Sequence, residues 1–265
     1  MVLDENYLEA DTFNQLQYLK QLEKLSVCKN NSSFATFPKS FKLTSLTELR
    51  FASNTITSID ELCSLRALKV LALENNKIAK LPINLSLLSD LEVLILANNM
   101  VGHYPSMVIQ AQVNLQQLDL SFNRLTIFPN KVGPGHTNLT ALNLSHNRLL
   151  LLPDSLAHCV NLNQINLTAN LLTAFPGPLR SLTKLQKLDV SHNKITEFPN
   201  WICGIGIVVM NCEGNQIKSL PTSICLLSEL KSLNLGSNLL ARLPPSMGYM
   251  TNLTTLIVEN NNLHS

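Results

Sequence analysis

The chain has 265 residues, of which 45% are hydrophobic and 14% are charged, and its formal net charge is +2. This composition excludes a disordered chain, because core material is plentiful and solvating charge is scarce. No run of Lys or Arg marks a nucleic-acid binder. The apolar stretches at residues 149–153 and 204–210 are far shorter than the roughly 20 residues that span a bilayer.

The N-terminal stretch "MVLDENYLEADTFNQ" is acidic and lacks the apolar region of a secretory signal, so we expect a cytoplasmic protein. Further along, Leu16, Leu19, Leu22 and Leu25 recur at intervals of three residues. This spacing is typical of a helix that leads into a strand. We therefore predict that residues 1–21 form an amphipathic N-terminal cap and that residues 22–265 form a separate repeat domain.

A nine-residue frame, LxxLxLxxN, recurs along residues 22–265 at intervals of 22 to 24 residues. A period of this length indicates a solenoid of stacked repeats. A second signal, xLxxLP, follows the frame, as in "NRLTIFP" and "NKITEFP". The frame closes eleven times, at Asn30, Asn54, Asn76, Asn99, Asn123, Asn147, Asn170, Asn193, Asn215, Asn238 and Asn261.

Each part of the frame has a physical reason. The fourth and sixth residues of LxxLxLxxN point to one side of a short strand, because side chains alternate across a strand. Stacked repeats then form a parallel sheet with an apolar inner face. The carboxamide of the closing Asn both donates and accepts hydrogen bonds, so a ladder of these residues would satisfy the buried turn amides. The proline suits the bend where the chain leaves for the outer side.

The pattern LPxxLxxLxxLxxLxLxxNxL, seen in "LPTSICLLSELKSLNLGSNLL", resembles the leucine-rich-repeat family and its intracellular Ras-associated class. The resemblance covers about residues 16–265. It implies an α/β fold: a right-handed horseshoe of about eleven repeats, with a parallel sheet on the concave side and mixed helical and irregular segments on the convex side.

Three stretches depart from the pattern. Asp60 stands where the proline is usual, which indicates an Asx-type cap for the next outer turn. Residues 130–138, "NKVGPGHTN", contain helix-breaking Gly and Pro and are predicted to form a loop. The chain stops soon after the last strand, without the polar unit that usually covers a solenoid end. We therefore expect that the C-terminal cap is missing and that the sequence belongs to a larger protein or caps by association.

The outward strand positions form the predicted binding surface. Basic Lys24, Lys29 and Arg50 begin it, apolar Val70 and Val93 follow, and the middle repeats are polar. An exposed aromatic with convergent polar groups is typical of a binding hot spot. The alternative is that "LDLSFN", "LNLSHN" and "LDVSHN" are common fillings of the repeat. The predicted protein-binding residues are Asp119, Phe122, Asn143, His146, Asn166, Asp189 and His192.

Trp201, the only tryptophan, is a second candidate contact on the outer flank. Its alternative role is to lie over the gap at Gly204 and Gly206. The six cysteines stand singly, without the CxxC spacing of a metal or redox site. Cys203 and Cys225 take equivalent places in neighbouring repeats, and free core thiols are favoured over a bridge in a reducing compartment.

Catalysis is not predicted. Ser121, His146 and Asp119 are the residue types of a hydrolase triad, but no oxyanion hole is evident. His146 and His192 lie two repeats apart, about 10 Å at the usual strand spacing, which is too far for one metal ion. The motifs GxxxxGK[ST], GxSxG and HExxH are missing. We expect no catalytic residues, no metal and no cofactor.

Two functions remain from the sequence. The first is a non-catalytic scaffold that binds a partner protein on its concave face, with a small GTPase or a kinase or phosphatase assembly as the partner in signal transduction. The alternative is the targeting domain of a larger enzyme, such as a Roco kinase, phosphatase, cyclase or ubiquitin ligase, whose catalytic part lies outside this sequence.

Overall fold

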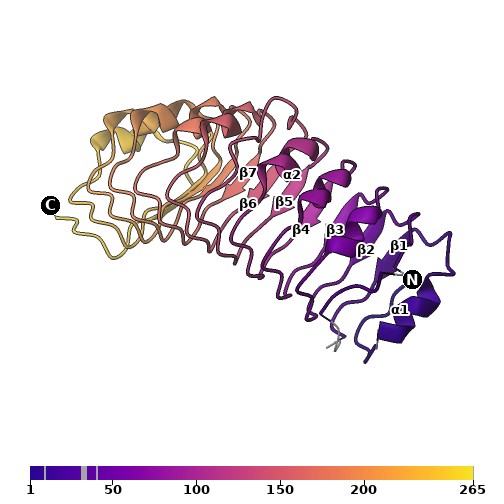
Figure 1. The fold of residues 1–265 in the computed structure, drawn as a ribbon. Helices are drawn as coiled ribbons and strands as arrows, with labels where there is room; N and C mark the ends of the chain where they lie inside the picture. The colour runs from indigo at the N-terminus through magenta and orange to yellow at the C-terminus, as the bar shows by residue number, and fades with distance from the viewer. Residues whose placement is uncertain (9, 31–34, 40, 265) are drawn as a thin grey trace.

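The computed structural model describes residues 1–8, 10–30, 35–39 and 41–264, and they form a curved, elongated solenoid with the two termini at opposite ends (Figure 1). Eleven parallel strands in these residues make one sheet, in sequence order. The predicted horseshoe is confirmed. The strands are β1 (Lys24–Ser26), β2 (Glu48–Arg50), β3 (Val70–Ala72), β4 (Val93–Ile95), β5 (Gln117–Asp119), β6 (Ala141–Asn143), β7 (Gln164–Asn166), β8 (Lys187–Asp189), β9 (Val209–Asn211), β10 (Ser232–Asn234) and β11 (Thr255–Ile257).

The strands stack in register because the middle residue of each one points into the core. Leu118 of β5 pairs with Leu94 on one side and Leu142 on the other. In β1 to β10 this middle residue is at most 2% exposed. In β11 the equivalent Leu256 is 39% exposed. The core therefore contains one continuous column of apolar residues, mostly leucines, along β1 to β10.

The closing asparagines form the predicted ladder. The side-chain Nδ2 of Asn123 donates to the backbone oxygens of Leu96 (2.9 Å), Leu120 (3.1 Å) and Ser121 (3.0 Å). Its Oδ1 accepts from the backbone N–H of Val101 at 2.9 Å. One side chain thus satisfies four backbone groups of its own repeat and the preceding one, which would be costly to bury unpaired. Asn123 is a structural residue.

The outer side carries short helices, most of which begin directly after the proline of the repeat pattern. Seven of them follow Pro82, Pro105, Pro153, Pro176, Pro199, Pro221 and Pro244. The helices in the described residues are α1 (Ala10–Leu16), η1 (Asp60–Ser64), η2 (Ile83–Leu87), α2 (Ser106–Ala111), η3 (Asp154–His158), η4 (Gly177–Ser181), η5 (Asn200–Gly204), η6 (Thr222–Leu226) and η7 (Pro245–Tyr249).

The helix η1 corrects one prediction. Its N-cap residue is Ile59, which provides no side-chain cap, so the Asx-type cap expected at Asp60 is wrong. The Asp60 carboxylate instead accepts a hydrogen bond from the Ser58 hydroxyl at 2.5 Å. Asp60 is therefore the first residue of the helix rather than its cap.

Residues 130–138 form turns, as predicted, and a buried histidine holds them in place. His136 is 2% exposed. Its Nδ1 accepts from the backbone N–H of Gly133 at 3.1 Å, and its Nε2 lies 2.7 Å from the backbone oxygen of Ile109 in α2. This histidine ties the loop to the preceding outer helix.

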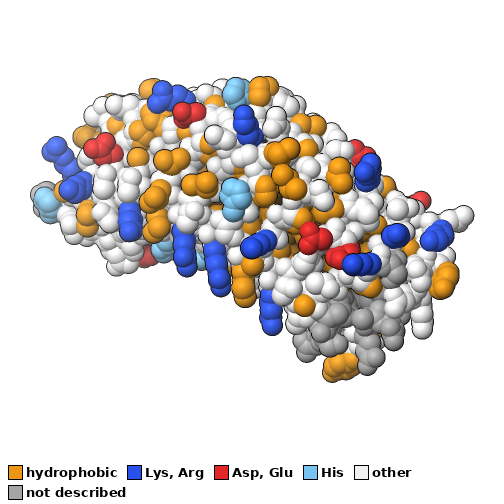
Figure 2. All heavy atoms as spheres, viewed as in Figure 1, with side chains coloured by type: hydrophobic (Ala, Val, Ile, Leu, Met, Phe, Trp, Pro, Cys, Tyr) orange, Lys and Arg blue, Asp and Glu red, His pale blue; other side chains and the backbone are white. Residues whose placement is uncertain are grey.

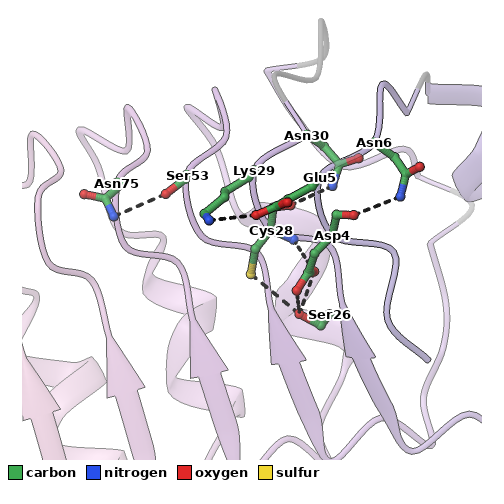
Figure 3. Close-up of polar contacts among 9 residues, drawn as sticks. All are labelled: Asp4, Glu5, Asn6, Ser26, Cys28, Lys29, Asn30, Ser53 and Asn75. Atoms are coloured by element: carbon green, nitrogen blue, oxygen red, sulfur yellow. Dashed lines mark hydrogen bonds and ion pairs between the residues drawn. The ribbon is translucent and has the colours of Figure 1, made fainter.

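The N-terminal segment lies beside β1 and extends the parallel pairing of the sheet (Figure 3). The backbone N–H groups of Leu3 and Glu5 donate to the carbonyls of Ser26 (2.8 Å) and Cys28 (2.9 Å). The Asp4 carboxylate accepts from the Ser26 hydroxyl at 2.8 Å and from the Cys28 N–H at 2.7 Å. These contacts satisfy backbone groups at the edge of β1, which an uncovered edge strand would leave unpaired.

Candidate functional site

The concave surface is hollowed over β5 to β9, with a volume of about 390 Å³. The predicted residues Asp119, Asn143, Asn166 and Asp189 all line this hollow. They come together because they occupy the last position of successive strands in register. We call this row the central column.

The side chains of the central column hydrogen-bond to the turns of their own repeats and to one another. Asp119 Oδ1 accepts from the backbone N–H of Ser121 at 2.9 Å and from its hydroxyl at 2.6 Å. Asp119 Oδ2 accepts from Asn143 Nδ2 of the next strand at 3.1 Å. Asp189 repeats the same contacts with Ser191 and Asn211. The recurring "LDLS" and "LDVS" motifs are thus turn-stabilising arrangements, in which an Asp side chain binds the backbone two residues on.

A neighbouring row of side chains, which was not among the predicted site residues, makes fewer contacts within the protein. Gln117, Gln164 and Lys187 occupy the first position of β5, β7 and β8, line the hollow and are exposed. In the described part of the chain, no side-chain hydrogen bond or ion pair engages their polar ends. These residues stand two positions before the central column in their strands. Because side chains alternate along a strand, this spacing predicts that both rows lie on one face.

Phe122 and His146 form an aromatic pair beside the hollow. Their rings stack with centroids 3.9 Å apart and planes 12° from parallel. Phe122 is 52% exposed and His146 is exposed as well. The two residues come from neighbouring repeats and adopt φ values of 52° and 53°. The pair offers a flat aromatic surface beside the central column.

The left-handed backbone of this pair is a property of the repeat. All eleven residues that precede a ladder asparagine have positive φ, from Lys29 to Asn260. His192 occupies the same position, and its Nδ1 lies 2.5 Å from where a Cβ of Gly214 would stand. The predicted His192 thus covers a glycine of the next repeat and lies apart from the stacked pair.

The predicted basic zone at the start of the surface is neutralised. Glu48 lies 2.6 Å from Arg50 Nε and 3.3 Å from Lys24 Nζ. The adjacent Arg50 side chain holds the pKa of the Glu48 carboxyl below its usual value. Lys29 Nζ lies 2.8 Å from Glu5 (Figure 3). Because Glu48 and Glu5 pair with all three cations of the predicted basic zone, this end of the surface is not a basic patch.

The arrangement does not form a hydrolytic triad. Ser121 is only 4% exposed, and its hydroxyl donates a hydrogen bond to Asp119. The His146 ring stacks on Phe122 instead of contacting that hydroxyl. Among the described residues, no group of three or more His, Cys, Asp or Glu side chains is placed to hold a metal ion. The helices of the described residues are all too short or too polar to cross a membrane.

Trp201 lies in η5, on the outer side, and is half-buried against the core. The Arg180 guanidinium carbon lies 5.8 Å from the centre of its ring. A Cβ added at Gly204 would meet nothing within 4 Å, so the ring does not fill the gap there. Trp201 packs on the core and carries a cation on its face.

An in-register parallel sheet, a ladder of buried asparagines and a hollowed open face define a solenoid repeat protein. The model of the leucine rich repeat family matches residues 113–172 and 137–195, and a second model, of paired leucine-rich repeats, matches residues 44–86. The chain is a leucine-rich-repeat protein. A search of curated proteins gave no match.

Solved structures share the fold. A leucine-rich-repeat protein of Leptospira interrogans is 26% identical, with a TM-score of 0.66, over 98% of this chain and 78% of that one. An internalin of Listeria monocytogenes is 24% identical, with a TM-score of 0.74, over 94% and 78%. The ectodomain of the Arabidopsis thaliana receptor kinase GASSHO1/SCHENGEN3, solved in complex with CASPARIAN STRIP INTEGRITY FACTOR 2, is 27% identical, with a TM-score of 0.72, over 94% and 34%.

Proposed function

We propose that this protein is a non-catalytic interaction scaffold that binds a partner protein on the concave face of its middle repeats. The observation that carries the proposal is the exposed Phe122–His146 stack beside a hollow lined by unengaged Gln117, Gln164 and Lys187. An aromatic anchor next to polar groups with free hydrogen-bonding capacity is the composition of a binding hot spot.

The hydrogen bonds of the central column support the same proposal. Because Asp119 and Asp189 brace the turns of their repeats, the neighbouring recognition residues are held in place before a partner arrives. A preformed surface loses less conformational entropy on binding than a flexible one. The site residues of the proposal are therefore Gln117, Phe122, His146, Gln164 and Lys187, with Asp119 and Asp189 as their support.

The proposal extends to the class of partner protein. The LPxxLxxLxxLxxLxLxxNxL pattern is similar to that of Ras-associated repeat proteins, which favours a small GTPase or its signalling complex. A cytoplasmic location accords with the six cysteines, all of which carry free thiols. The complex of the Arabidopsis ectodomain with its named factor is a case of ligand binding by a protein of similar fold.

The test is affinity purification from cytosol with mass spectrometry, comparing the intact chain with a triple variant, Phe122→Asn, His146→Asn and Gln164→Ala. Asn tolerates the left-handed backbone at the first two positions, so the variant is designed to fold. Circular dichroism and a urea titration would check this. We expect partners that are captured by the intact chain and lost from the variant.

The matched control is Leu226→Asn, Tyr249→Asn and Gln110→Ala, which changes exposed residues of the outer helices, away from the concave face. It should retain the partners that the concave variant loses. Retention of every partner by the folded concave variant would contradict the proposal.

A further inference from the structure

A second surface lies on the side of the solenoid where the chain runs from the ladder asparagine to the outer helix. We call it the descending flank and define it as the six residues after the ladder asparagine in eight consecutive repeats. Its segments are residues 77–82, 100–105, 124–129, 148–153, 171–176, 194–199, 216–221 and 239–244.

The descending flank is strongly basic although the whole chain carries only +2. It has one carboxylate, Glu197. Its seven cations are all exposed, and none of them forms an ion pair within the described residues. Figure 2 shows Lys and Arg side chains in a row along the lower rim of this view, with few Asp or Glu side chains beside them. The cations are Lys77, Lys80, Arg124, Arg148, Lys194, Lys218 and Arg242.

Apolar side chains are exposed within the same flank. Ile127 is 57% exposed, Leu150 is 61% exposed and Leu151 is 64% exposed. Leu150 and Leu151 line a hollow of about 730 Å³ that also includes the exposed Asp154 and continues to residues 173–178 of the next repeat. Both leucines face outward because the segment is irregular and its buried positions are already taken by Leu149 and Leu152. The hollow lies in the middle of the row of cations.

We propose that the descending flank binds an acidic, extended polypeptide segment of a partner protein, with an apolar side chain of that segment seated in the hollow between residues 150–155 and 173–178. Charge complementarity selects the occupant, because seven unpaired cations against two carboxylates, Glu197 of the flank and Asp154 of the hollow, favour a polyanion. The cations are spread over six of the eight segments, with two in residues 77–82 and one in each of the other five, and this arrangement matches a chain that runs along the solenoid axis. The exposed leucines add an apolar anchor that a purely electrostatic surface lacks.

This site is separate from the concave face. The cations of the descending flank follow the ladder asparagine, whereas Gln117, Gln164 and Lys187 precede it in the strand. One partner protein therefore has two surfaces to use, or two partners bind at once.

The test is fluorescence anisotropy with a fluorescein-labelled peptide of repeated Glu-Glu-Leu units. We expect saturable binding that weakens when the salt concentration rises from about 0.05 to about 0.5 M, because screening acts on exposed charges. The variant Arg124→Glu, Arg148→Glu and Lys194→Glu should bind at least about tenfold more weakly, since each reversal replaces attraction by repulsion. The double variant Leu150→Ala, Leu151→Ala should bind this peptide more weakly. Its affinity for a peptide of repeated Glu-Glu-Ser units should be unchanged.

The matched control reverses three exposed cations outside the flank, Lys42→Glu, Arg66→Glu and Lys231→Glu, and gives the same change of net charge. It should retain most of the peptide binding. An equal loss in both triple variants would show that net charge alone attracts the peptide and would overturn the site.

Two further outcomes would also overturn it. One is the absence of saturable peptide binding to the folded chain. The other is tight binding to phosphatidylcholine vesicles that contain phosphatidylserine, lost in the flank variant, combined with peptide binding that this variant leaves unchanged. That pattern would assign the cations to a lipid surface.

Discussion

The concave face and the descending flank use their polar side chains in opposite ways. On the concave face, the side chains of Asp119 and Asn143 hydrogen-bond to the turns of their own repeats and to each other. On the flank, Arg124 and Arg148 are exposed and unpaired within the described residues. A polar row on a solenoid is therefore not by itself a binding site, because the contacts of its side chains decide what it has left to offer.

The largest change in stability is expected in the asparagine ladder, whose residues lie between the concave face and the descending flank in the sequence of each repeat. Asn123→Ala leaves the buried N–H of Val101 without its partner and removes one of the two side-chain hydrogen bonds to the carbonyl of Leu96. We expect a loss of roughly 3 kcal/mol in the free energy of unfolding, since each buried unpaired group costs about 1 to 3 kcal/mol. Urea denaturation measures it. The control Asn130→Ala, at an exposed position, should change stability by under about 0.5 kcal/mol.

Thiol reactivity gives a second contrast, between the core and the surface. Burial raises the pKa of Cys63 and Cys159 to about 12, so almost no thiolate forms at pH 8. Cys28 and Cys225 are only partly buried. We expect these two to react with a disulfide reagent at pH 8 at least about 100-fold faster than Cys63 and Cys159. Equal rates for all four would contradict the packing of the outer layer. Mass spectrometry of the labelled peptides identifies the sites.

Two substitutions on the concave face should differ in their effect on stability. Asp119→Ala removes hydrogen bonds to Ser121 and Asn143 and should cost about 1 to 2 kcal/mol of unfolding free energy. Gln164→Ala, in the same hollow, should cost under about 0.5 kcal/mol, because its side chain is exposed and unengaged. Similar costs for both substitutions, measured by urea denaturation, would remove the distinction between supporting and recognition residues.

The smallest effect is expected on the flank. Arg148→Ala and Leu150→Ala should each shift the free energy of unfolding by under about 0.5 kcal/mol, because both side chains are exposed. The urea midpoint and its slope would report this. A larger loss from either change would mean that the flank helps to hold the solenoid together.

The repeat pattern alone predicted the strands, the asparagine ladder, the loop at residues 130–138 and the proline before most outer helices. It did so because a residue that recurs in every repeat at one position must solve the same packing problem each time. The candidate site was predicted less well. The pattern placed Asp119 and Phe122 on one surface but gave no sign that Asp119 binds the Ser121 backbone while Phe122 stacks on His146.

Sequence by itself therefore determined the architecture of this protein, since periodic burial of leucine and asparagine leaves one way to stack the repeats. Only the tertiary structure decided which polar side chains are engaged. Glu48 of β2 pairs with Lys24 of the neighbouring strand β1, and His136 contacts the backbone of Ile109, which lies 27 residues away in the sequence. Such pairings depend on distances between side chains in adjacent repeats, and a one-dimensional pattern carries no measure of them.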